Sequence, residues 1–212
     1  MTNTELLALF RIDVDDLEAT YLWSDTSVYG WIDEAQKQFC RDTQGIADAR
    51  SFRLNISVAK QWYAVDPRIL KIRGAMNQAT GAEVPLIALE RMGTHDMVFN
   101  GATGVIKALI TGMEKNQLRA YPVPNATATV ELHTFRLSTD MATGDDFEID
   151  AQHVRNLLMW VKHRAYGVQD SEVYDKNKSA NFKAEFGAYC RRVIDEQSRL
   201  SHIAGTVAYG GI

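Results

Sequence analysis

The sequence predicts an α+β protein in which a helical bundle carries an inserted antiparallel β domain. Apolar residues recur every three or four positions, the period of a helix, in residues 1–48 and again in residues 141–200. Between them, in residues 49–140, the period changes to two, which is typical of strands. No linker rich in Pro, Gly or Ser separates these parts, so the simplest architecture is one bundle with a β insertion. Residues 201–212 contain three glycines and no helical period, and we expect a C-terminal tail there.

Two helices are expected in the N-terminal part. Residues 4–10 form a short apolar helix candidate, and the period breaks at residues 11–16. Ser24 or Asp25 can cap a second helix by accepting a hydrogen bond from its first N–H groups. Gly45 is a suitable C-terminal stop for that helix. The apolar face of the second helix consists of Val28, Trp31, Ile32, Ala35, Phe39 and Cys40.

The β part should contain about six strands. One alternating apolar face consists of Phe52, Leu54, Ile56 and Val58, and Leu70 and Ile72 continue the pattern. Residues 105–110 predict a more buried strand, residues 112–116 a turn, and residues 118–121 the returning strand. The apolar phase then changes, which predicts a β-bulge near residues 133–134.

Two more helices are expected in the C-terminal part. An acidic segment at residues 143–150 precedes them, and negative charge there stabilises the N-terminus of a helix. The apolar face of the first helix consists of Val154, Leu157, Leu158, Val161 and Ala165, and that of the second of Phe182, Phe186, Tyr189, Cys190 and Val193.

The charge balance argues against a protein that grips nucleic acid. The net charge is −4, whereas phosphate neutralisation by basic residues supplies most of the affinity of a nucleic-acid binder. Such a surface is compatible with handling DNA without binding it. The N-terminus lacks the basic and apolar regions of a signal peptide, and no apolar run approaches the ~18 residues of a membrane span. We expect a protein that is cytosolic at synthesis and does not contact a membrane.

The motifs that carry catalytic or cofactor chemistry are incomplete. Gly101–Lys107 lacks the spacing and the following hydroxyl residue of a phosphate-binding loop. Asp13, Asp15 and Asp16 lack the Gly and Glu that complete a calcium loop, so a solvated loop is expected. No two of the five histidines are three or four residues apart, and both cysteines are expected to be buried thiols. We therefore expect no enzyme activity, no cofactor and no metal site.

Aromatic residues near strand ends leave a binding function open. Trp62, Tyr63 and Tyr121 lie near the ends of expected strands, where exposed aromatic rings can stack on sugars or bases. Packing in the core or at a domain junction is the structural alternative.

Several short segments resemble, in this order, head-to-tail adaptor proteins of tailed bacteriophages. Tyr21–Asp25 precedes a helix that carries an acidic-Ala-Gln signature within Trp31–Gln36. The β segment ends near Tyr121-Pro-Val-Pro124 and Phe135-Arg-Leu137, and the acidic turn at residues 145–148 follows. The matching positions in the closing helices are Ala165, Tyr166, Asp170, Phe182 and Phe186.

The resemblance covers about residues 5–200 and implies a structural virion protein of the head–tail neck, assembled in the host cytoplasm. It implies a homo-oligomeric ring with twelve-fold symmetry that docks on the portal protein and extends the DNA channel. DNA would pass through without specific binding, and downstream tail or neck proteins would attach to the ring. Alternatives are another neck component (a head-completion or tail-terminator protein), a carbohydrate-binding β module that uses Trp62 or Tyr63, and a hydrolase whose site has no recognised motif.

The tail is the predicted partner-docking segment. Its apolar residues are Ile203, Val207, Tyr209 and Ile212, and no charged side chain follows Arg199. A purely solvated tail would more often be polar or charged. In the adaptors that this chain resembles, the end of the chain after the last helix is similarly a portal-facing element. Because the helix faces left to solvent are charged, we expect the isolated protein to be a monomer or a weak oligomer that forms its ring on the portal.

Overall fold

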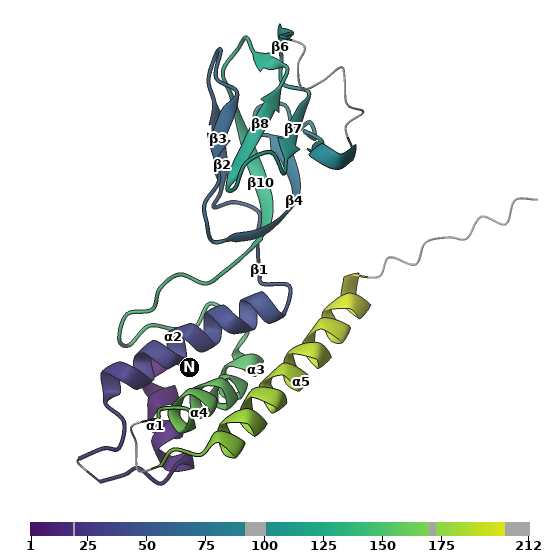
Figure 1. The fold of residues 1–212 in the computed structure, drawn as a ribbon. Coiled ribbons are helices and arrows are strands. Elements are labelled where there is room, and N and C mark those ends of the chain that lie inside the picture. Colours follow the sequence, from purple (N-terminus) through teal and green to yellow (C-terminus); the bar gives the residue numbers. More distant parts are fainter. Residues whose placement is uncertain (19, 92–100, 170–172, 202–212) are drawn as a thin grey trace, which may run out of the picture. The chain divides into compact units, whose positions relative to one another are not determined.

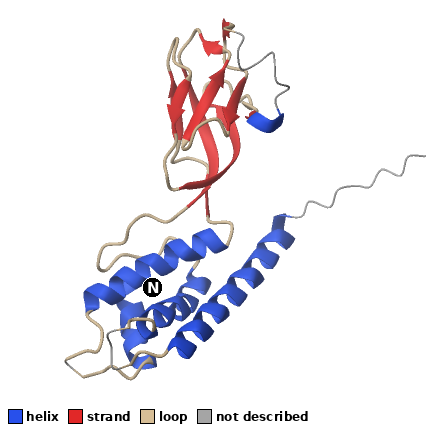
Figure 2. Ribbon diagram, viewed as in Figure 1, coloured by secondary structure: helices blue, strands red, loops and turns tan. Residues whose placement is uncertain are grey.

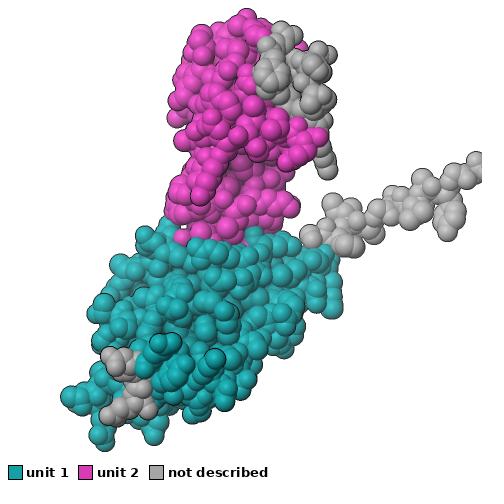
Figure 3. Space-filling model, viewed as in Figure 1, with its two compact units in different colours: residues 1–44, 139–212 teal, residues 45–138 magenta. Residues whose placement is uncertain are grey.

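A computed structural model describes residues 1–212 except 19, 92–100, 170–172 and 202–212. The chain forms two compact units, one of residues 1–44 with 139–212 and one of residues 45–138 (Figure 3). The first unit contains the long helices and the second the strands (Figure 2), so the fold class is mixed α+β as predicted. Within the described part of the chain, none of the helices combines the length and the hydrophobicity that a bilayer crossing needs.

The helical unit begins with two capped helices, α1 (Asn3–Asp13) and α2 (Asp25–Asp42) (Figure 1). The predicted cap of α2 is confirmed, because Ser24 Oγ accepts a hydrogen bond from the Ser27 N–H at 3.2 Å. The predicted break at residue 11 is wrong, since α1 continues to Asp13 with the Arg11 side chain buried. The predicted stop at Gly45 is also wrong, because Thr43 is the C-terminal cap of α2.

The C-terminal helices are α3 (Ala151–Val154), a short 3₁₀ turn η2 (Arg155–Leu157), α4 (Leu158–Tyr166) and α5 (Lys176–Ser201). The apolar face predicted for the helix before α5 is confirmed, since its five residues, which lie in α3, η2 and α4, are all buried. On α5 the buried members of the predicted stripe are Phe186, Cys190 and Val193, while Phe182 and Tyr189 are half-buried. Aromatic rings join the helices: the centroids of Phe10 and Trp23 are 5.6 Å apart, and those of Trp160 and Phe186 are 5.3 Å apart.

The described residues of the β unit form ten strands, more than the six expected, because several are only two to four residues long. They are β1 (Ile46–Asp48), β2 (Arg53–Ile56), β3 (Trp62–Ala64), β4 (Ile69–Asn77), β5 (Leu86–Ala88), β6 (Thr103–Gly104), β7 (Ala108–Thr111), β8 (Gln117–Tyr121), β9 (Val123–Pro124) and β10 (Ala128–Arg136). A 3₁₀ turn, η1 (Leu89–Arg91), follows β5.

The strands form two four-stranded sheets and one small pair. In the first sheet β10 pairs with β1, β2 and β4, and in the second the order is β3-β8-β7-β5. The pairs β5–β7 and β6–β9 are parallel, so the expectation of a purely antiparallel β domain is corrected. A buried cluster draws residues from both sheets, including Leu54 and Val130 from the first and Leu109 and Leu118 from the second. The two sheets therefore pack face to face.

Three strand predictions can be compared with the register. A register shift lies at the predicted position, between His133 and Thr134 of β10, but the extra residue is Arg73 of β4, because Gly74 and Ile72 pair with these two consecutive residues. Val58 is wrong as a core position: it lies in a turn after β2 and is 55% exposed. The strand predicted from residue 105 begins only at Ala108, and Val105 is 68% exposed.

Candidate docking surfaces

The acidic-Ala-Gln segment of α2 holds the helical unit together. Gln36 is fully buried, and its Oε1 accepts a hydrogen bond from the Glu148 N–H at 2.9 Å. Asp33 accepts a second backbone hydrogen bond from the same returning segment, at 3.2 Å. Between these two residues Glu34 forms an ion pair with Arg164 of α4 at 3.1 Å. The segment thus fixes both the returning chain and α4 on α2, which gives it a structural role.

The two described histidines of the helical unit serve packing. His153 is buried, and its Nδ1 lies 2.7 Å from the Tyr189 hydroxyl. His163 Nδ1 lies 2.9 Å from Ser179 Oγ. Burial lowers the pKa of His163, and neighbouring cations lower it further. Among the described residues no group of three His, Cys, Asp or Glu side chains is placed to hold a metal ion.

The cysteines lie in the core, as predicted. Cys40 and Cys190 are both buried within the helical unit. Burial raises the pKa of the Cys190 thiol to about 12, and the Asp42 carboxylate contributes in the same direction. A thiol in this state is a poor nucleophile at neutral pH, because the thiolate is the reactive form.

The two aromatic residues of β3, Trp62 and Tyr63, lie in different environments. Tyr63 is buried; its hydroxyl donates a hydrogen bond to the Lys60 carbonyl at 2.8 Å and accepts one from the Ser57 N–H at 3.0 Å. Trp62 is half-buried, with the Arg119 guanidinium carbon 5.7 Å from its ring centroid. The suggestion that Tyr63 contacts a sugar is therefore wrong: its hydroxyl closes the turn between β2 and β3.

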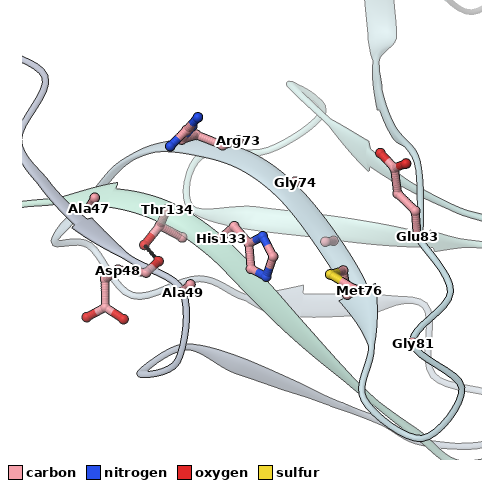
Figure 4. Close-up of a pocket in the computed structure, with 11 residues that line it drawn as sticks. Ala47, Asp48, Ala49, Arg73, Gly74, Met76, Gly81, Glu83, His133 and Thr134 are labelled. Carbon is pink, nitrogen blue, oxygen red and sulfur yellow. Dashed lines mark hydrogen bonds between the residues drawn. The ribbon is translucent and has the colours of Figure 1, made fainter. Parts of the chain in front are cut away.

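A hollow of about 520 Å³ lies over β1, β4 and β10. Gly74 leaves room in it, since a Cβ added there would meet no atom within 4 Å. His133 stands near the middle, and the charged groups of Arg73, Asp48 and Glu83 point in different directions instead of converging (Figure 4). The hollow thus lacks the convergent polar groups of a catalytic site.

Asp48 closes one edge of that hollow as a structural clasp. Its carboxylate accepts hydrogen bonds from the backbone N–H groups of Arg50 and Ser51 at 3.0 and 2.9 Å, and from Arg136 Nε at 2.8 Å. Burial raises the pKa of Asp48, but the hydrogen bonds from Ser51, Arg50 and Arg136 outweigh it and hold the pKa well below its ordinary value. We call these interactions the Asp48 clasp.

A second clasp organises the loop between α1 and α2. Arg11 forms a buried ion pair with Asp16, and its Nη2 donates to the Trp23 carbonyl at 2.8 Å and pairs with Asp25 at 2.6 Å. Asp16 Oδ1 in turn accepts a hydrogen bond from the Leu22 N–H at 3.0 Å. The expectation of a wholly solvated acidic loop is therefore wrong for Asp16, because a partner five residues earlier draws it inward. We call these interactions the Arg11 clasp.

The end of α1 and the loop held by the Arg11 clasp present large apolar side chains to solvent. Ile12 is 62% exposed, Leu17 61% and Leu22 51%, and Tyr21 is also exposed. We call these four residues the α1–α2 knob. They are four of the ten large apolar side chains that the described residues expose, gathered within a short stretch of chain. Such a concentration marks an interaction surface. The sequence signal for this surface is the presence of Leu17, Tyr21 and Leu22 among acidic residues.

A pocket of about 400 Å³ opens where α2, α4 and the start of α5 meet. Gly167 permits the close approach of the last two, because a Cβ there would lie 3.1 Å from the His163 carbonyl oxygen and 3.3 Å from Ser179 Oγ. We call this site the α4–α5 pocket; it is lined by Trp31, His163, Arg164, Gly167, Val168, Tyr174, Lys176 and Ser179. Its rim is thus aromatic and basic.

The predicted tail residues Ile203, Val207, Tyr209 and Ile212 lie outside the described residues, as do His95, Asp170 and His202.

The polar groups of the Asp48 and Arg11 clasps stabilise the fold, whereas the α1–α2 knob exposes several large apolar side chains together. Such a surface is typical of a protein that binds other proteins. The family model of the SU10 adaptor protein matches residues 1–208. The chain therefore belongs to the SU10 adaptor protein family, a family of structural phage adaptors and not of enzymes. No curated protein matches the chain.

Proposed function

We propose that this protein is a head-to-tail adaptor of the virion neck. Copies of the chain form a twelve-fold ring that docks on the portal protein, extends the DNA channel and offers an attachment platform to downstream tail or neck proteins. The observation that carries the proposal is the family match over residues 1–208, which includes every described helix and strand. The proposal includes no catalytic activity and no cofactor.

The proposed architecture is a helical bundle, residues 1–48 and 141–200, with an inserted β domain at residues 49–140. The division of the chain into a unit of residues 1–44 with 139–212 and a unit of residues 45–138 supports it. The net charge of −4 per chain suits a channel that DNA must leave without being held. The protein would assemble in the host cytoplasm and remain in the virion, without membrane contact.

The tail is the proposed portal-docking element. Its apolar residues Ile203, Val207, Tyr209 and Ile212 follow a helix that ends at Ser201. An extended segment of residues 202–212 reaches up to ~40 Å, which is enough to cross onto a neighbouring subunit. Ordering it costs about 1–2 kcal/mol per residue, so its apolar side chains must find pockets on the partner.

The test is attachment of the purified chain to DNA-filled heads that carry the portal. We expect full-length protein to co-sediment with the heads and to form a twelve-fold density at the portal by electron cryomicroscopy. Deletion of residues 202–212 should leave the circular dichroism spectrum and the melting temperature unchanged but abolish attachment. A matched variant with the four apolar tail residues replaced by serine keeps the length and should lose attachment as well.

The outcomes separate the neck components. Attachment to isolated tails instead of heads would make the protein a tail terminator and refute the adaptor proposal. Unchanged attachment of both tail variants would move the docking surface from the tail to the helical unit.

A further inference from the structure

The α1–α2 knob is held in its exposed position. Arg11, buried beneath the loop, fixes it through Asp16 and the Trp23 carbonyl, and the Tyr21 ring centroid lies 3.6 Å from the Arg11 guanidinium carbon. A loop fixed in this way cannot fold its leucines back into the core without breaking a buried ion pair. The apolar surface of the knob therefore stays exposed in the folded chain, and burial of this surface would stabilise a complex with a partner that covers it.

The α4–α5 pocket has the complementary character. Trp31 is half-buried and Tyr174 is exposed, and together they offer apolar ring surface inside a hollow of about 400 Å³. That volume admits more than one aliphatic side chain. Arg164 and Lys176 are exposed at its rim.

The charges of the two surfaces are opposite. Asp15 and Glu18 are exposed beside the knob leucines. At the pocket, Arg164 is paired with Glu34, and the exposed Lys176 in the first turn of α5 adds a second cation. Asp175 caps this turn, since its Oδ1 accepts hydrogen bonds from the Asn177 and Lys178 N–H groups, both at 2.9 Å. Lys176 is therefore the charge at the rim that an acidic apolar partner would meet.

The two surfaces lie on opposite sides of α4. Lys162 Nζ pairs with Asp13, next to the knob, at 2.6 Å. Arg164, two residues later, lines the pocket. Residues two apart on an α-helix point ~200° away from each other. The knob of a subunit therefore cannot fill its own pocket, and both remain available to other copies.

We propose that the α1–α2 knob of one subunit inserts into the α4–α5 pocket of a second copy of this chain, and that repetition of this contact closes the ring. The contact is heterologous, with one patch meeting a different one, which is the geometry that builds cyclic assemblies larger than dimers. This inference rests on the proposed ring function and names the residues that make it.

Engineered cysteines test the contact in the full-length protein. The native thiols Cys40 and Cys190 are buried, so surface cysteines react selectively. A variant with both Leu17→Cys and Tyr174→Cys, treated with a short bismaleimide, should give a ladder of covalent oligomers, on filled heads and at high concentration in solution. A mixture of the two single variants should give the covalent dimer and nothing larger. Val58→Cys combined with Tyr174→Cys is the matched control, and it should give no ladder, because Val58 is equally exposed but lies in the β unit.

Charge reversal gives a second readout. Glu18→Lys or Lys176→Glu alone should weaken self-association roughly tenfold, because each places like charges together, and the double variant should recover it. A loss of affinity for duplex DNA in Lys176→Glu, with self-association unchanged, would instead identify the pocket as a phosphate-binding surface and overturn the inference.

The results keep this inference separate from the adaptor proposal. Attachment of the protein to filled heads without the Leu17–Tyr174 ladder would refute the knob-in-pocket contact and leave the adaptor role standing. A ladder in solution without attachment to heads would support the contact and refute the adaptor role. Covalent dimers from Leu17→Cys alone would indicate a two-fold contact and refute the ring geometry.

Discussion

Replacing Asp16 with alanine should destabilise the helical unit by about 3 kcal/mol. The substitution removes the buried carboxylate that pairs with Arg11 and accepts the Leu22 N–H at 3.0 Å. Arg11 itself stays buried, so its charge loses its best-shielded partner.

The magnitude follows from what remains around Arg11. Truncating one partner of a buried ion pair typically costs about 3–5 kcal/mol, because an uncompensated charge is left behind. Here the guanidinium keeps the Trp23 carbonyl at 2.8 Å and Asp25 at 2.6 Å, although the Asp25 side chain is 55% exposed and therefore screened. This remaining partnership places the expected loss at the lower end of the range. Asp16→Asn keeps an acceptor for Leu22 and should lose about half as much, roughly 1.5 kcal/mol.

Urea unfolding followed by circular dichroism at 222 nm measures the loss, since the helices dominate that signal. Hydrogen exchange of the Leu22 amide should accelerate in parallel, because its acceptor is gone. Asp15→Asn is the matched control: Asp15 is exposed with φ of 57°, a conformation that asparagine also adopts readily. We expect the control to stay within about 0.5 kcal/mol of the unaltered chain. If the free energy of unfolding of Asp16→Ala also stayed within about 0.5 kcal/mol of the unaltered chain, the Arg11 clasp would not support the loop, and the account of a fixed knob would fail.

Two further predictions concern ionisable groups. The pKa of Asp48 lies below its ordinary value of 3.8, so its contribution to the stability of the β unit is present above pH 3.8 and is lost as the pH falls further. In urea unfolding, Asp48→Asn should be about 2 kcal/mol less stable than the unaltered chain at pH 7, and its stability should fall less steeply in acid. Equal acid profiles of the two proteins would contradict this. The pKa of Cys190 is raised from 9.0 to about 12, so its stabilising effect is complete below pH 9 and is lost between pH 9 and 12. At pH 8 iodoacetamide should label Cys190 only after unfolding, with Val58→Cys as the exposed control that labels at once; rapid labelling in the folded state would refute its burial.

Periodicity predicted the helices well because each helix buries a single face within its own sequence. The first turn of α2 was readable from Ser24, and the faces around Val161 and Phe186 follow from spacing alone. In the β unit the same reasoning extended strands too far. Val58 lies past the end of β2 and Val105 lies before the start of β7, and nothing local marks where pairing begins or stops.

The candidate surfaces were harder to predict because they depend on pairing between distant residues. Asp16 resembles any solvated acid until Arg11 is known to be buried beside it. The α4–α5 pocket joins Trp31 with Lys176, which are far apart in the sequence. The parallel pairing of β5 with β7 likewise has no local signature, since short apolar strands can pair in several orders.

The pairing of β1 with β10 has a consequence for the history of the chain. Ile46 lies opposite Arg136, and the Asp48 clasp fastens these strands together where the chain enters and leaves the β unit. Paired residues in neighbouring strands have Cα atoms ~5 Å apart, a span that a tight turn also bridges. For the helices on either side, residues 45–138 are therefore equivalent to a short surface turn, however long the excursion between its two ends. Such a segment behaves as an exchangeable cassette: recombination can enlarge, trim or replace it while the scaffold that carries it keeps its own fold.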